Sequence, residues 1–119
     1  WRRSLLDWKS RFQNDFVFEY SDPFRTAAST PLDESKHTLR FRQAPYLDKS
    51  TDFTDNNDDP GLTGCTVWDA SLVLSHFLVK NASLRIYNRN ILELGSGIGL
   101  CGILCTQLHA KSVTLTDLA

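Results

Sequence analysis

Two short stretches in the first third of the chain alternate apolar with polar residues. The apolar positions are Phe16, Phe18 and Tyr20 in the first stretch and Leu39 and Phe41 in the second. A period of two indicates a strand with one buried face, and the turn-forming pair Asp22-Pro23 ends the first stretch. The pattern predicts a hairpin-like pair over residues 15–43, with a long polar loop at 25–36 between its strands.

Three other segments have the spacing of helices. Residues 1–13 place large apolar side chains at helical spacing between basic residues, which predicts an amphipathic helix whose aromatic stripe packs against the protein. A second helix is expected to be capped by Asp69 and to end near Asn81. Its apolar positions on one face are Leu72, Val73, Phe77 and Leu78. The third helix is expected to run from Leu100 to Leu108, with Leu100, Ile103, Leu104 and Leu108 on one side.

Residues 48–61 are too poor in apolar side chains to pack, so we expect a mobile linker there. Their carboxylates suggest a calcium site. An EF-hand loop, however, needs acidic or amide residues at alternate positions, a central glycine and a terminal glutamate. The spacing here does not meet that requirement, and a solvated loop is favoured.

The last third of the chain combines a strand, a glycine-rich turn, a helix and a second strand. The apolar run Ile91-Leu92-Glu93-Leu94 predicts a buried strand, and Gly95-Ser96-Gly97-Ile98-Gly99 follows it as the turn. A polar connection at 83–89 leads into this strand. Residues 112–116 are rich in β-branched residues and predict the next strand. This order predicts a βαβ unit with parallel strands and a right-handed crossover.

The glycine turn is a candidate nucleotide site. Glycines allow a ligand to approach the backbone, and the N–H groups of the following helix face negative charge. Asp117 ends the next strand, about 20 residues beyond the first glycine, where an acidic side chain can accept hydrogen bonds from ribose hydroxyls. The spacing differs from the GxGxxG of dinucleotide folds, and Glu93 precedes it. A cofactor made of adenosine and an amino acid therefore fits better than a dinucleotide. An NAD-dependent oxidoreductase and a binding protein without activity remain the alternatives.

Composition narrows the class of protein. The chain has 119 residues, 41% hydrophobic and 23% charged, as in one ordinary globular domain. A net charge of -1 provides no field that would attract nucleic acid or an anionic membrane. No apolar stretch approaches the roughly 18 residues of a membrane span, and no signal peptide is recognisable. We expect no nucleic-acid or membrane partner and a cytoplasmic location, with the nucleus as a second one. The chain begins at Trp1 and ends directly after an apolar run, so we expect a fragment.

Other reactive side chains do not point to a further site. The three cysteines, an odd count, are Cys65, Cys101 and Cys105. They lack a CxxC pair, so buried reduced thiols are favoured over zinc, and no metal site is expected. The candidate bases are His37, His76 and His109. Surface or packing roles are favoured for all of them.

A resemblance sharpens the interpretation. Residues 93–100, Glu-Leu-Gly-Ser-Gly-Ile-Gly-Leu, resemble the first motif of seven-strand, class I methyltransferases. With Thr66-Val67-Trp68-Asp69-Ala70-Ser71 upstream and Leu115-Thr116-Asp117 downstream, residues 61–119 are similar to small eukaryotic protein-lysine methyltransferases that modify chaperones and translation factors. The resemblance implies an α/β, Rossmann-like class I methyltransferase fold, truncated after its second core strand. Residues 1–60 would be an N-terminal α+β extension and linker, and residues 61–119 the first part of the cofactor-binding domain.

The resemblance also implies S-adenosyl-L-methionine as cofactor and a protein substrate, possible examples being a chaperone or a translation factor. It places Trp68 against the cofactor, although a core aromatic is the alternative, and Asp117 at its ribose. The turn residues implied in cofactor binding are Gly95, Ser96, Gly97 and Gly99, the first three of them at the methionine part. Glu93 would act through water or the turn on the ammonium group, and Asp69 is favoured as helix cap over cofactor contact. The family's acidic or amide motif after the fourth strand has no counterpart, so the catalytic residues are unknown and expected beyond Ala119, and the fragment itself is expected to be inactive.

Overall fold

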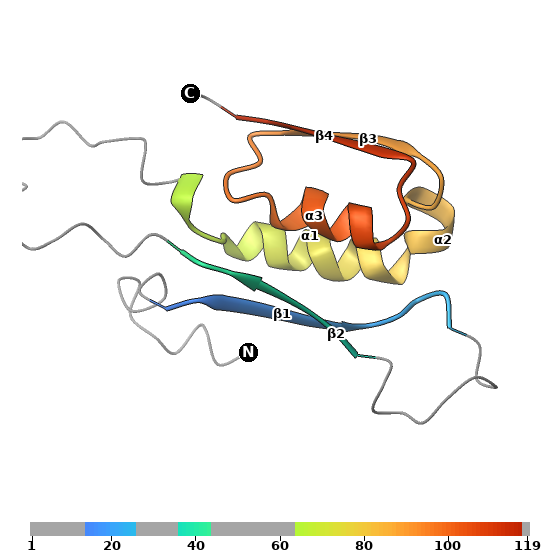
Figure 1. Cartoon of the computed structure of the whole chain (residues 1–119), viewed down its shortest axis with the longest axis horizontal. Helices are drawn as coiled ribbons and strands as arrows, with labels where there is room; N and C mark the ends of the chain where they lie inside the picture. Colours follow the sequence, from blue (N-terminus) through green and yellow to red (C-terminus); the bar gives the residue numbers. More distant parts are fainter. Residues whose placement is uncertain (1–13, 26–35, 44–63, 118–119) are drawn as a thin grey trace, which may run out of the picture.

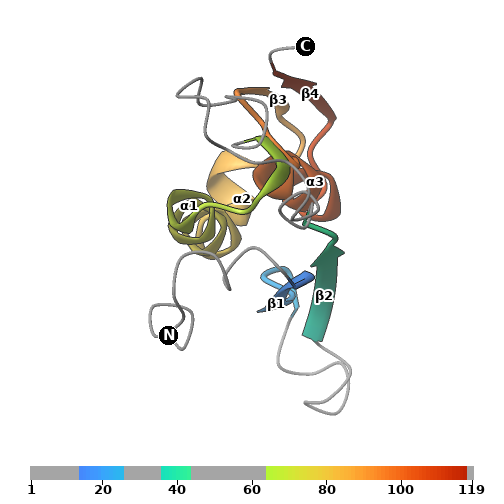
Figure 2. The same cartoon turned by 90° about the vertical axis from the view of Figure 1, so that its left-hand side faces the viewer.

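The computed structural model describes residues 14–25, 36–43 and 64–117, whose elements lie in three layers (Figure 1). In chain order the elements are β1 (Phe16–Ser21), β2 (Lys36–Phe41), α1 (Asp69–Lys80), α2 (Ala82–Arg85), β3 (Asn90–Leu94), α3 (Leu100–Gln107) and β4 (Ser112–Thr116). The turned view in Figure 2 shows the helices between the β1–β2 pair and the β3–β4 pair. The helix expected at 1–13 and the linker expected at 48–61 lie outside the described residues.

The predicted hairpin pair is confirmed. Strands β1 and β2 pair antiparallel, with Phe16 opposite Phe41 and Ser21 opposite Lys36. Alternate residues of β1 are buried, as the period of two predicts. At the end of β1 the Asp22 side chain accepts a hydrogen bond from the Phe24 N–H at 2.9 Å. This local turn uses a backbone group that strand pairing would otherwise need, so the strand ends here.

One hydrophobic core joins the hairpin to the helices. Its large buried members are Phe18, Tyr20, Phe41, Val67, Leu72, Ile86, Leu100, Leu104 and Leu108. Aromatic contacts add to it: the ring centroids of Phe18 and His76 are 5.1 Å apart, and those of Phe24 and His109 are 5.4 Å apart. Fully burying an aliphatic or aromatic side chain of this size stabilises the fold by about 1.5 to 3 kcal/mol. The hairpin is therefore held to the helical layer by direct packing.

Helix α1 ends at Lys80 with Asn81 as C-cap, as expected, but the prediction that Asp69 caps its start is wrong. The N-cap is Trp68, whose backbone is extended and whose carbonyl accepts hydrogen bonds from the N–H groups of Ser71 and Leu72, at 3.0 and 3.3 Å. Asp69 is the first residue inside the helix. A carboxylate in the first turn still interacts favourably with the helix dipole.

The buried face of α1 also differs from the expected one. Leu72 and Ser75 are buried, whereas Val73 and Phe77 are 58% and 49% exposed. Ser75 lies against α3, and its Oγ is 3.6 Å from the Sγ of Cys101. Because a serine is small, the two helices can approach at this point, and this contact turns the face containing Ser75 inward.

The predicted strand, turn, helix and strand of the last third are confirmed. Strands β3 and β4 pair parallel, with Asn90 opposite Ser112 and Leu94 opposite Thr116, and α3 connects them. Leu100, Leu104 and Leu108 are buried as expected, while Ile103 is 36% exposed. The polar connection expected at 83–89 includes the end of the short helix α2.

Strand β3 is not the fully buried strand that its apolar run predicts. Ile91 and Glu93 are partly buried on one face, whereas Leu92 and Leu94, on the other, are 62% and 75% exposed. Within the described residues, α3 covers only one face of the β3–β4 pair, as Figure 1 shows. None of the helices that the structure describes has the length and apolar character to cross a membrane.

Candidate functional site

The parallel pairing of β3 and β4 brings the glycine turn and Asp117 together. The carboxyl ends of parallel strands meet at one edge of a sheet. The glycine turn follows the carboxyl end of β3, and Asp117 follows the carboxyl end of β4. The Asp117 carboxylate accepts a hydrogen bond from the Gly97 N–H. The Ser96 N–H donates to the Thr116 carbonyl at 3.0 Å, which extends the strand pairing into the turn. Residues that the sequence analysis assigned to one site are therefore neighbours in space.

The three glycines of the turn have left-handed backbones, with φ of 63° at Gly95, 52° at Gly97 and 78° at Gly99. Their surroundings differ. A Cβ at Gly97 would lie 3.0 Å from the Gly64 carbonyl oxygen, and one at Gly99 would lie 3.2 Å from a methyl carbon of Leu115. At Gly95, apart from the glycine and its two chain neighbours, no heavy atom of the described residues lies within 4 Å of that position. Gly95 thus leaves the backbone open to a ligand, while Gly97 and Gly99 allow close packing within the chain.

The Glu93 side chain contacts α3, the helix that follows the glycine turn. Its carboxylate accepts a hydrogen bond from the Gly102 N–H at 2.7 Å, in the first turn of α3. The N-cap of α3, Gly99, has no side chain to serve this N–H, so a residue of the neighbouring strand does so. Burial raises the pKa of Glu93 above its usual value, although the Gly102 hydrogen bond acts in the opposite direction.

The segment at 64–68, which ends in Trp68, borders the turn from the other side. Its Gly64 carbonyl makes the close approach to Gly97, and Val67, only 1% exposed, anchors it in the core. The Trp68 side chain is 50% exposed. Trp68 is therefore not the core aromatic that the alternative interpretation required.

Two of the three cysteines are buried in the described part of the chain, and the histidines pack against aromatic rings. Cys101 and Cys105 are buried as expected, and burial raises the pKa of Cys105 to about 11 and also raises that of Cys101. Cys65, expected to be buried, is partly exposed, and all three are free thiols. Packing roles are confirmed for the three histidines, whose rings contact aromatic rings: His76 on Phe18, His37 on Tyr20 and His109 on Phe24.

Two residues that support the site were missed by the sequence analysis. A Cβ at Gly102 would lie 2.0 Å from Leu115 Cδ2 and 2.7 Å from the Glu93 carboxylate, so any larger residue there would have to displace these side chains. The available signal was a glycine inside a predicted helix, which often marks close packing. Gln43 is 3% exposed and hydrogen-bonds to the backbone just before Trp68. No local pattern distinguishes this glutamine from a surface one.

Comparison with known proteins identifies the family to which this chain belongs. A family model described as lysine methyltransferase matches residues 48–119, more than half of the chain. The chain belongs to this lysine methyltransferase family. Its members are S-adenosylmethionine-dependent protein methyltransferases with a Rossmann-like fold. The membership favours the methyltransferase interpretation over an NAD-dependent oxidoreductase.

Individual relatives agree with the family. The chain is 38% identical over 58 residues to the human protein-lysine N-methyltransferase EEF2KMT, a match that covers 48% of this chain and 17% of the relative. It is 45% identical over 51 residues to protein N-lysine methyltransferase METTL21A of Xenopus tropicalis, covering 43% of this chain and 23% of the relative. With protein-lysine methyltransferase METTL21E of Bos taurus it shares 38% identity over 63 residues, 52% of this chain and 21% of the relative. The chain spans about a fifth of the length of the curated relatives it matches.

Proposed function

We propose that this chain provides S-adenosylmethionine-binding residues of a protein-lysine N-methyltransferase. The observation that carries the proposal is the hydrogen bond between Asp117 and Gly97, beside the open backbone at Gly95. An acidic side chain next to an accessible glycine turn combines a ribose acceptor with backbone that a small polar ligand can approach. Family membership supports the choice of this cofactor.

Each residue of the candidate site then has a distinct task. Asp117 accepts hydrogen bonds from the ribose hydroxyls, which is compatible with its bond to Gly97 because an ionised carboxylate can accept about four hydrogen bonds. Gly95, Ser96 and Gly97 line the methionine part of the cofactor. Trp68 provides an aromatic surface against which the cofactor lies.

The remaining two residues, Gly99 and Glu93, support the glycine turn and do not contact the cofactor directly. Gly99 allows α3 to begin close to Leu115, so that the turn keeps its shape. The Glu93 carboxylate holds the start of α3 through its hydrogen bond with the Gly102 N–H. By fixing the start of this helix, Glu93 influences the glycine turn at the cofactor's ammonium group. Both roles concern the shape of the site rather than direct chemistry.

When bound, the cofactor supplies a methyl group on a sulfonium that a neutral amine can attack in line. The protein's own task is to hold and orient the reactants and to exclude water. The acceptor we propose is a lysine side chain of a protein, with chaperones and translation factors as candidates. A lysine amine has an ordinary pKa of about 10.4, so the acceptor site must favour its neutral form. We assign none of the described residues to that task.

Calorimetry on the whole protein with S-adenosylmethionine and with NAD tests cofactor choice. We expect S-adenosylmethionine to bind and NAD to bind more weakly or not at all; tighter binding of NAD would contradict the proposal. Transfer of label from methyl-labelled cofactor to lysines, located by mass spectrometry, tests the reaction. Binding without transfer to any protein of a lysate would favour the alternative of an inactive binding protein.

A further inference from the structure

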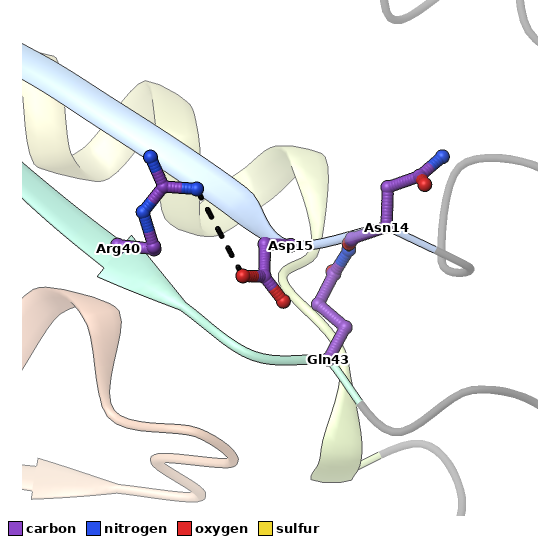
Figure 3. Close-up of polar contacts among 4 residues, drawn as sticks. All are labelled: Asn14, Asp15, Arg40 and Gln43. Carbon is purple, nitrogen blue, oxygen red and sulfur yellow. Dashed lines mark hydrogen bonds and ion pairs between the residues drawn. The ribbon is translucent and has the colours of Figure 1, made fainter.

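A buried glutamine connects the N-terminal hairpin to the segment that borders the glycine turn. Gln43 follows β2, and only 3% of it is exposed. Its Nε2 donates a hydrogen bond to the Asn14 carbonyl at 2.8 Å, and its Oε1 accepts one from the Val67 N–H at 2.9 Å. Figure 3 shows its side chain extending to the backbone at Asn14, just before β1. One side-chain amide thus joins three segments that are separated in the sequence.

The chemistry of the two partners determines how the amide is oriented. A backbone N–H can only donate and a carbonyl oxygen can only accept, so the Gln43 oxygen must face Val67 and its nitrogen must face Asn14. The opposite orientation would place two donors together and two acceptors together, in a buried position where unsatisfied polar groups are costly. Glutamine is therefore the residue that meets both partners without a charge.

The Val67 end of this connection lies next to the candidate site. Val67 precedes Trp68, the N-cap of α1, and the same short segment includes Gly64, whose carbonyl approaches Gly97. The Gln43 hydrogen bond holds the backbone immediately before Trp68, and the burial of Val67 holds its side chain. The direction in which Trp68 leaves the core thus depends on a residue of the hairpin.

We propose that Gln43 is a positioning residue for the cofactor site. It acts through Val67 by keeping Trp68 and the segment at 64–68 beside the glycine turn, and so it makes the N-terminal hairpin a part of the cofactor-binding unit. The inference rests on the proposed function, because it takes the glycine turn as the cofactor site. It adds to that function a residue that does not itself touch the cofactor.

The first test compares two substitutions in the same hairpin of the whole protein. Gln43→Met keeps the length of the side chain and removes both hydrogen bonds. Arg40→Gln is the control, because it breaks only the exposed 3.9 Å ion pair between Arg40 and Asp15, drawn in Figure 3. We expect Gln43→Met to weaken S-adenosylmethionine binding by about three- to tenfold, the equivalent of one hydrogen bond. Arg40→Gln should leave the dissociation constant unchanged. Unchanged affinity in a folded Gln43→Met protein would overturn the proposal.

A pH series on Gln43→Glu provides a conservative rescue. A protonated glutamic acid can donate to the Asn14 carbonyl and accept from the Val67 N–H, whereas the carboxylate would face the Asn14 carbonyl with a second acceptor. The ratio of variant to wild-type dissociation constants should therefore fall towards one as the pH is lowered. The same ratio for Gln43→Met should stay constant. A Gln43→Glu ratio that stays above one at every pH would also overturn the proposal.

Amide hydrogen exchange separates failure of this inference from failure of the proposed function. The Val67 amide should exchange faster in Gln43→Met than in wild type and at the wild-type rate in Arg40→Gln. If wild-type protein does not bind S-adenosylmethionine, the proposed function fails. The exchange rates at residues 67–70 then test separately whether Gln43 holds the backbone at Val67. Faster exchange in Gln43→Met alone supports it, and equal exchange in both variants contradicts it.

Discussion

The carboxylate of Glu93 lies 2.7 Å from the backbone nitrogen of Gly102, so a residue of β3 serves as a cap for α3. The glycine turn lies between these two residues in the chain. The shape of the turn therefore depends on a hydrogen bond that joins β3, before the turn, to α3, after it. A second bond, from the Thr116 hydroxyl to the Glu93 carbonyl at 3.1 Å, connects β4 to the same point.

The first prediction concerns this cap. Glu93→Ala removes the acceptor of the Gly102 N–H and should lower the free energy of unfolding by about 1 to 2 kcal/mol, the range for a lost helix cap or a buried hydrogen bond. Glu93→Gln keeps an oxygen at the same distance from the backbone and should cost less. Urea unfolding of the two variants measures the difference. Equal losses would show that the hydrogen bond does not contribute.

A pH dependence follows from the burial of the same residue. Burial raises the pKa of Glu93 in the folded protein above its ordinary 4.5, so in this window the folded state binds the proton more tightly than the unfolded chain. The contribution of Glu93 to stability should therefore decrease as the pH rises from about 4.5 through its folded pKa. Glu93→Gln does not titrate and is the reference. Unfolding midpoints of both proteins over a pH series should diverge in this window, whereas parallel profiles would contradict the raised pKa.

Gly102→Ala should be destabilising even though it lies inside a helix. Alanine is favoured over glycine there by about 1 kcal/mol. Its methyl group, however, would lie 2.0 Å from Leu115 Cδ2 and 2.7 Å from the Glu93 carboxylate. Overpacking of this kind costs about 1 to 3 kcal/mol. Gln107→Ala, at an exposed position of the same helix, is the control and should be close to neutral in thermal unfolding. A stabilised Gly102→Ala protein would mean that the Leu115 and Glu93 side chains can move aside at little cost.

Asp117→Ala tests the proposed ribose contact. Loss of hydrogen bonds to an ionised carboxylate should weaken S-adenosylmethionine binding by about 1.5 to 3 kcal/mol. The control is Ser112→Ala, which removes the exposed 2.9 Å bond to Asn90 at the opposite end of β4. Calorimetry should give a wild-type dissociation constant for that control. If folded Asp117→Ala also binds like wild type, the assignment of Asp117 is refuted.

Native-state thiol labelling should modify Cys65 first. Cys65 is partly exposed, whereas Cys101 and Cys105 are 5% and 2% exposed. With a pKa of about 11, only about a thousandth of Cys105 would be thiolate at pH 8. Alkylation followed by peptide mass spectrometry should therefore find label at Cys65 before unfolding and at all three residues after it. Early labelling of Cys105 would show that α3 opens in the native state.

Local pattern was sufficient to predict most of the described elements. The period of two predicted β1 and β2, and β-branched residues predicted β4 at Ser112–Thr116. The glycine spacing, with a strand before it and a helix after it, predicted the turn. Asp117 was assigned to the same site from its place at the end of the following strand, about 20 residues beyond the first glycine. These features depend on residues close in the chain or on the rules of strand pairing.

Tertiary structure decided the details that depend on distant partners. Ser75, rather than Val73 or Phe77, faces inward because Cys101 of another helix lies against it. Glu93 caps α3 because the strand and helix pack directly, and Gln43 is buried because it meets Asn14 and Val67 from two other segments. Hydrophobic periodicity describes which residues prefer burial. It does not describe where a side-chain amide or carboxylate will find a backbone partner, because that partner is brought to it only when the layers pack.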